Sequence, residues 1–254
     1  MGLEINKPLG VGGINQKYYY QPKSASFGNN YVDTFESNLP QKYTSEIAIR
    51  KAIENNPKIK NITKDFNPEL KLNMKELEEV LQNHSSDTQN IAKGIVQNLP
   101  FSLKNKVDIK SLDTAAYLHD IGKVLIPSEV LNKPGRLNDA ETKIMHTHSE
   151  LSYEILKNSG LDDKVLKLIR NHYQNAKRTG YPWVTQDFNA DLNLQILSIA
   201  DKYSALTEKR IYKDPLSPKE ALTIISRDVE EGKLHPFVFK ALVNFANTYQ
   251  PIKV

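Results

Sequence analysis

The chain has 254 residues, 39% of them hydrophobic and 25% charged, which is the balance of a folded globular protein and not of a disordered chain. The longest apolar run, Ala115–Leu118, is far shorter than the about 20 residues of a membrane-spanning helix, so no such helix is expected. No signal-peptide pattern opens the sequence, and we expect a cytoplasmic protein. Cysteine is absent, which excludes disulfides, iron–sulfur clusters and thiolate metal sites. Lys and Arg exceed Asp and Glu by 34 to 30 without long charge runs, so a nucleic-acid partner is not expected.

Residues 1–66 are expected to form a largely irregular extension. Gly, Asn, Ser and Pro are dense in the first 40 residues, and neither a helical nor a strand period is sustained there. Apolar residues at Ile47, Ile49 and Ile53 predict one short helix at about 44–55. The extension could tether a partner protein whatever the rest of the chain does.

Residues 67–254 are expected to form a domain of amphipathic helices. The first helix carries a long stripe at three- and four-residue steps, made of Met74, Leu77, Leu81, His84, Thr88, Ile91, Ile95 and Leu99. Later helix starts are marked by Asn138 with Glu141, by Asp162, and by Ser217 with Pro218 and Glu220. Alternating strand patterns are missing, so the expected fold class is all-α.

Four of the six histidines fall on apolar stripes of four different expected helices, and an aspartate, Asp201, does so on a fifth. The histidines are His84, His119, His148 and His172, and Asp120 directly follows His119. Burying these groups in one small core without partners would cost several kcal/mol each. Metal ions at their point of convergence would remove that cost.

The two remaining histidines serve as a contrast. His146 shares a helix face with Thr142 and Ser149 and is expected to face solvent. His235 precedes Pro236 in a connection and is expected to be structural. Neither is predicted to bind a metal.

Several motifs in order along residues 67–243 closely resemble the HD-GYP family, a branch of the HD-domain metal-dependent phosphohydrolases. They are Leu118–Pro127 with the His119-Asp120 pair, Lys133–Leu137, Met145–His148, Asn171-His172, Gly180-Tyr181-Pro182 and Ile199–Thr207. The resemblance implies a helical HD-domain bundle with a two- or three-metal centre and hydrolysis of cyclic di-GMP.

The resemblance also implies the site residues. The implied metal ligands are His84, His119, Asp120, His148, His172 and Asp201, with Asp120 bridging two ions. Asp120 and Lys123 are expected to be catalytic, and Lys123, Arg210, Lys213 and Tyr181 are expected to contact the substrate. We expect two ions per chain, Fe or Mn first, with Ni, Zn or Mg as further candidates. Two divalent cations would lower the pKa of a shared water and compensate charge on the phosphoryl oxygens.

The sequence departs from the family near the Gly-Tyr-Pro motif. Tyr173 stands where the family has a second histidine, and Gln174 stands where it has a glutamate. Val80 occupies the position of a glutamate that helps hold a third metal in some members, so a trinuclear site is not expected. Trp183 could stack on a base or fill a gap in the core.

These departures leave three functions open. The leading one is a cyclic-dinucleotide phosphodiesterase. The second is an HD-domain hydrolase of another nucleotide or phosphate ester. The third is a catalytically inactive module that binds a nucleotide or a partner protein.

Overall fold

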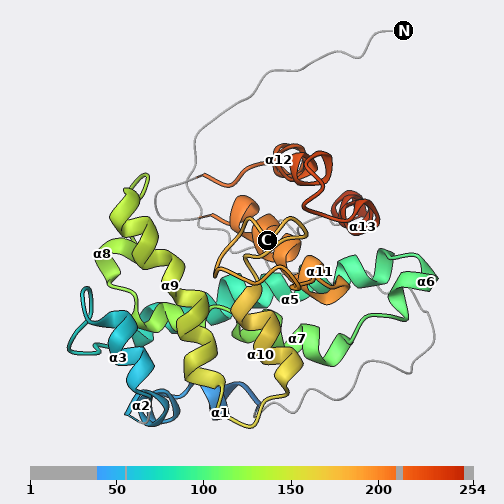
Figure 1. Ribbon diagram of the computed structural model, residues 1–254. Helices are drawn as coiled ribbons and strands as arrows, with labels where there is room; N and C mark the ends of the chain where they lie inside the picture. The colour runs from blue at the N-terminus through green and yellow to red at the C-terminus, as the bar shows by residue number, and fades with distance from the viewer. Residues whose placement is uncertain (1–38, 55, 210–213, 249–254) are drawn as a thin grey trace, which may run out of the picture.

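A computed structural model of the chain describes residues 39–54, 56–209 and 214–248. This part of the chain is built from helices and contains no strand, which confirms the expected all-α class (Figure 1). None of its helices is long and apolar enough to cross a lipid bilayer. The predicted tether at the N-terminus falls mostly on residues 1–38, which lie outside the described residues.

Three helices precede residue 67, where the sequence predicted one. They are α1 (Leu39–Thr44), α2 (Glu46–Glu54) and α3 (Pro57–Thr63). The helix predicted at about 44–55 corresponds to α2, and the expectation of an otherwise irregular segment is corrected for α1 and α3. The signal missed for α3 is Asn56, whose side chain accepts a hydrogen bond from the Lys58 N–H, followed by a proline in the first turn.

The anchor of α3 is a buried polar contact with α9 (Asp139–Leu156). The Asn56 amide donates to the Glu154 carbonyl oxygen at 3.1 Å and to the Glu154 carboxylate. The Lys58 ammonium lies 3.0 Å from the same carboxylate. These contacts tie residues 56–58 to the helical body.

The long predicted stripe from residue 74 to 99 is confirmed, but its helix is not a continuous α-helix. It consists of α4 (Met74–Val80), a π-helical turn η1 (Leu81–Ser85) and α5 (Ser86–Asn98). Every predicted stripe position except half-buried Met74 is buried. A π-helical turn inserts an extra residue into one turn, and such turns occur often at functional sites.

The remaining elements follow in short steps around α5. They are α6 (Phe101–Lys104), α7 (Ile109–Leu118), the 3₁₀ helix η2 (Ile121–Leu125), α8 (Ser128–Leu131), α9, α10 (Asp163–Asn171), α11 (Leu192–Thr207), α12 (Pro218–Glu230) and α13 (Pro236–Thr248). The predicted capping boxes at Asn138–Glu141 and Ser217–Glu220 are both present, and Asp162 caps α10. The starts of these three helices were thus readable from the sequence.

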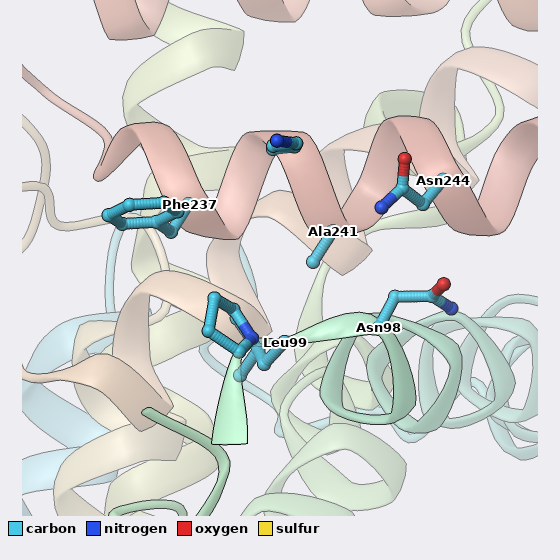
Figure 2. Close-up of a pocket in the computed structure, with 7 residues that line it drawn as sticks. Asn98, Leu99, Phe237, Ala241 and Asn244 are labelled. Carbon is cyan, nitrogen blue, oxygen red and sulfur yellow. The ribbon is translucent and has the colours of Figure 1, made fainter. Parts of the chain in front are cut away.

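The core lies around α5, which packs against α7, α11 and α13, while α9 packs against η2 and α10 (Figure 1). A pocket opens between the end of α5 and α13, with Leu99, Phe237 and Ala241 in its lining (Figure 2). Asn98 at this pocket is on the order of 20 Å along the helical rod from His84, by the rise per residue of a helix. The pocket is therefore separate from the histidine cluster.

Candidate metal centre

The six predicted ligands, from five segments of the chain, converge in the interior. His84 comes from η1, His119 and Asp120 from the junction of α7 and η2, His148 from α9, His172 from the end of α10, and Asp201 from α11. Each is at most 4% exposed. The structure therefore brings together the whole set of residues that the sequence singled out.

One half of the cluster is organised around Asp201. Its Oδ1 atom lies 2.9 Å from Nε2 of His84 and 3.7 Å from Nε2 of His119. The ligand atoms of these three residues lie within 4.8 Å of one another, close enough to share one metal ion. His119 also faces Asp120, with 3.4 Å between its Nε2 and Oδ2 of that carboxylate.

The other half is organised around the second oxygen of Asp120. Oδ1 of Asp120 lies 3.2 Å from Nε2 of His148 and 4.0 Å from Nε2 of His172. The Nε2 atoms of these two histidines are 3.2 Å apart. The two oxygens of Asp120 thus face different groups of imidazoles, as a bridging carboxylate would.

Backbone carbonyls set the orientation of three imidazoles. The Nδ1 atoms of His119, His148 and His172 lie 2.9, 2.6 and 2.6 Å from the carbonyl oxygens three residues earlier in the chain. A carbonyl oxygen only accepts, so each Nδ1 carries the proton and donates it. Each Nε2 therefore points its lone pair into the cluster, which is the arrangement of a metal-binding histidine whose other nitrogen is held by the protein.

The cluster has buried polar atoms that the described part of the chain leaves unpaired. Among these residues, Nε2 of His119 and Oδ1 of Asp120 are buried without a hydrogen-bond partner, and the Nε2 lone pairs of His148 and His172 face each other. Unpaired buried acceptors are costly, and cations bound among them would remove that cost. The imidazole and carboxylate donors present here fit a divalent transition metal.

The pKa values of the cluster follow from burial and from opposite charges. Burial lowers the pKa of His148 to about 4 and that of His172 to about 3, so both are neutral at pH 7. Burial also acts on His84, but the hydrogen bond to Asp201 and the contact with Glu208 outweigh it and raise its pKa to about 9. Burial opposes ionisation of the Asp120 carboxyl, but the charges of Lys123 beside it and of His84 hold its pKa well below the usual range.

Lys123, which was predicted to contact the substrate, lies at the edge of this cluster. It sits in η2, its side chain is 12% exposed, and its ammonium is ion-paired with the Asp120 carboxylate. A cation at this place can compensate a negative charge that arrives next to Asp120. Arg210 and Lys213, the two other predicted phosphate contacts, lie outside the described residues.

A buried serine that sequence reasoning missed holds the His119–Asp120 turn. The Ser152 hydroxyl of α9 donates to the His119 carbonyl oxygen at 2.7 Å and accepts from the Gly122 N–H at 2.8 Å. A side chain at Gly122 would place its Cβ 2.2 Å from the His148 carbonyl oxygen, so only glycine permits this close approach to α9. The apolar spacing of α9 gave no signal for Ser152 beyond a small residue on the buried stripe.

A second polar group missed by the sequence lies behind His84. The Ser204 hydroxyl is 3.1 Å and the Glu208 carboxylate 3.4 Å from Nδ1 of His84. These partners fix the ring so that its Nε2 faces Asp201, a role that carboxylates often have behind metal-binding histidines.

The Gly-Tyr-Pro segment covers the side of the cluster formed by His148. The Tyr181 ring centroid is 6.4 Å from that of His148, edge to face, and 3.8 Å from that of His146, with which it is stacked. His146 is exposed as predicted, but one face of its ring is occupied by Tyr181. Trp183 is 80% exposed, so it does not fill a gap in the core.

His235 behaves as a structural residue. It lies in the connection before α13, where its Nδ1 accepts from the Phe237 N–H at 3.2 Å and its ring stacks on that of Phe237. It therefore acts as a cap for α13, in agreement with the prediction.

Comparison with known proteins gives consistent matches for this chain. A family model described as HD domain matches residues 69–236. The 3'3'-cGAMP-specific phosphodiesterase 1 of Vibrio cholerae is 30% identical over 171 residues, covering 67% of this chain and 39% of the relative. The cyclic di-GMP phosphodiesterase of Thermotoga maritima is 32% identical over 144 residues, covering 55% of this chain and 38% of the relative.

Among solved structures, the HDG"Y"P protein Bd1817 from Bdellovibrio bacteriovorus has a similar fold. The TM-score is 0.51 at 18% identity, and the match covers 79% of this chain and 68% of that one. The chain spans less than half the length of the curated relatives named above. The similarity therefore concerns the helical domain that holds the histidine cluster.

Proposed function

The chain belongs to the HD-domain phosphohydrolase family, and from that premise we propose that it is a metal-dependent phosphodiesterase that hydrolyses a cyclic dinucleotide. The observation that carries the proposal is the inward orientation of Nε2 in His119, His148 and His172 around the two oxygens of Asp120. The names of the relatives, which act on 3'3'-cGAMP or cyclic di-GMP, support this substrate class.

The donor set supports a centre for two divalent ions, with Fe or Mn as the first candidates. His84, His119 and Asp201 would hold one ion, His148 and His172 the other, and Asp120 both. When bound, such ions supply Lewis-acid charge and a water of lowered pKa. The protein contributes neutral imidazoles, since burial keeps the pKa values of His148 and His172 far below 7.

Lys123 and Tyr181 are proposed as the substrate contacts. The Lys123 ammonium lies beside Asp120 and can move from that carboxylate to a phosphate oxygen of the substrate, where it stabilises developing negative charge. The Tyr181 ring is stacked on both His146 and Tyr173, so its hydroxyl edge is the part that can meet the bound nucleotide. Arg210 and Lys213 remain predicted contacts on residues outside the described part.

One observation favours a second candidate, a hydrolase of another nucleotide or phosphate ester. Tyr173 stands next to His172 where the family has a histidine, and an ordinary phenol keeps its proton at neutral pH. A phenol that keeps its proton is a poor metal ligand, so the second ion would have one protein ligand fewer. Such a change at the centre can alter which phosphate ester reacts.

The test is hydrolysis by protein purified without oxygen and supplied with Mn²⁺ or Fe²⁺. Cyclic di-GMP, 3'3'-cGAMP and a set of nucleotide phosphoesters are assayed, with Asp120→Asn as the control because it keeps the size of the side chain and removes its charge. Turnover of a cyclic dinucleotide that the variant abolishes supports the proposal. Turnover of another ester alone supports the second candidate, and no turnover of any ester by a metal-loaded protein leaves the inactive binding module.

A further inference from the structure

The side chain of Gln174 contacts the backbone on both sides of Tyr181. Gln174 is 2% exposed. Its amide Nε2 donates to the Pro182 carbonyl oxygen, and its Oε1 accepts from the Gly180 N–H at 3.2 Å. Both residues that flank Tyr181 are therefore fixed by one buried amide.

The two hydrogen bonds require an amide. An amide offers one donor and one acceptor group, whereas a carboxylate only accepts. Glutamate at this position could still accept from the Gly180 N–H, but it would place a buried charge against the Pro182 carbonyl oxygen. The glutamine, which departs from the family pattern, is thus matched to the backbone it holds.

Tyr173 supports the same segment through its ring. The Tyr173 ring stacks on that of Tyr181, with centroids 4.4 Å apart and planes at 16°. Its other neighbours are the cluster imidazoles, with centroid distances of 4.6 Å to His172 and 5.4 Å to His148. A side chain at Gly180 would place its Cβ 1.8 Å from the Tyr173 carbonyl oxygen, so the segment lies directly against this backbone.

The stretch that carries these two residues is itself fixed to the centre. It begins with His172, whose imidazole points into the cluster and whose carbonyl oxygen accepts from the Ser198 hydroxyl of α11. Three successive residues, 172 to 174, thus face the metal site, the Tyr181 ring and the backbone around Tyr181.

We propose that Tyr173 and Gln174 are positioning residues that hold Tyr181 in place beside the metal centre, so that substrate meets a preformed contact. This inference rests on the proposed function for its kinetic consequence, but the positioning itself can be measured without substrate. In this chain the segment is held by the stacking of Tyr181 on Tyr173 and on His146 and by the Gln174 amide, and Tyr173 is not a metal ligand.

The first test uses Gln174→Glu with Gln195→Glu as a matched control. Gln195 also bridges two backbone groups, the Ala190 carbonyl oxygen and the His235 N–H, but it does so at the start of α11 away from Tyr181. Trp183 is the only tryptophan and follows Pro182, so time-resolved anisotropy of its fluorescence reports the motion of the segment. We expect faster depolarisation in Gln174→Glu and no change in the control.

Kinetics then give the functional consequence. In metal-loaded protein that turns over a substrate, Gln174→Glu should lower kcat/KM on the order of tenfold to a hundredfold at unchanged metal content, since misplacing a positioning group by about 1 Å has effects of this size. Unchanged Trp183 anisotropy in Gln174→Glu overturns the positioning role. The anisotropy result stands even for a protein that hydrolyses nothing, so failure of the proposed function is told apart from failure of this inference.

A second pair of variants covers the case in which Gln174→Glu does not fold. Tyr173→Leu removes the stacked ring, and Tyr173→Phe keeps the ring while removing the hydroxyl. We expect Tyr173→Leu to release Trp183. Tyr173→Phe should release it less, because it loses only the contact between the Tyr173 and Tyr181 hydroxyls, and it should leave the number of bound Mn²⁺ ions unchanged. Loss of an ion in Tyr173→Phe would assign the phenol oxygen as a ligand and overturn the inference.

Discussion

Ser152→Ala is the sharpest test of how the protein holds the His119–Asp120 pair. The hydroxyl joins the His119 carbonyl oxygen to the Gly122 N–H, and all three residues are buried. Alanine leaves both backbone groups without this partner, and each buried group that loses its partner costs about 1–3 kcal/mol. We therefore expect a loss of about 2–6 kcal/mol in the free energy of unfolding.

Ser149→Ala provides the control on the same helix. Ser149 is equally buried, but within the described part of the chain its hydroxyl donates only to the His146 carbonyl oxygen of α9, at 3.4 Å. That carbonyl belongs to the helix interior, so the expected loss is about 1 kcal/mol or less. Urea unfolding of metal-stripped protein measures both values.

The same substitution should weaken metal binding. Residues that orient metal ligands typically change affinity about 10–100-fold when removed. Calorimetric titration of the folded Ser152→Ala protein with Mn²⁺ measures this effect, and Ser149→Ala should bind as the unchanged chain does. If the two variants lose the same stability within about 0.5 kcal/mol, the reasoning about Ser152 is refuted.

Three further predictions concern charge, pH and the N-terminal helices. Lys123→Met should abolish most hydrolysis while leaving the bound metal unchanged, as steady-state kinetics with metal analysis would show; lost metal would contradict it. Metal-stripped protein should lose stability as pH falls from about 6.5 to 4. The reason is that the folded-state pKa values of His148 and His172 lie below the unfolded value, so these two residues take up protons in the unfolded chain first. Asp87, with a folded-state pKa of about 6, takes up one proton in the folded chain and offsets only part of this difference. If urea unfolding shows a free energy of unfolding that stays level or rises as pH falls across this range, the prediction is wrong. Asn56→Ala should cost about 2 kcal/mol by freeing α3 from α9, and an unchanged melting temperature would refute it.

Much of the centre was readable from the sequence because a polar imidazole on an apolar helix stripe is costly to bury without a partner. His84, His119, His148 and His172 each interrupt a helical stripe at a position where the chain would otherwise place an apolar residue. That conflict needs a common solution, and convergence on metal ions is one. The starts of α9, α10 and α12 were readable for a local reason, since capping side chains contact the backbone within three residues.

The groups that orient these ligands were not readable, because their partners are far away in the sequence. Ser152 contacts a carbonyl 33 residues earlier, and Ser204 contacts a ring 120 residues earlier. A serine on a buried helix face has the same local pattern whether or not such a partner exists. The π-helical turn at His84 was missed for a related reason, since its stripe of apolar residues fits a regular helix equally well.

The altered residues beside the Gly-Tyr-Pro motif show both what the sequence could predict and what it could not. The sequence showed that Tyr173 and Gln174 depart from the family, and it located the departure beside the expected site. The contacts of Gln174 with Gly180 and Pro182 depend on the path of the loop between them, which no local pattern determines. The structure therefore shows that the two residues that depart from the family pattern make specific contacts with the Gly-Tyr-Pro segment.

The most direct test of a two-metal centre in this protein is the number of divalent ions that the cluster binds. Metal-stripped protein is titrated with Mn²⁺ without oxygen and analysed by calorimetry and elemental analysis, side by side with His119→Gln and Asp120→Asn. We expect two ions per chain. Both variants should clearly lose binding, because His119 and Asp120 lie between the two halves of the cluster. Binding that is absent from the unchanged chain, or unaffected by both variants, would contradict this expectation.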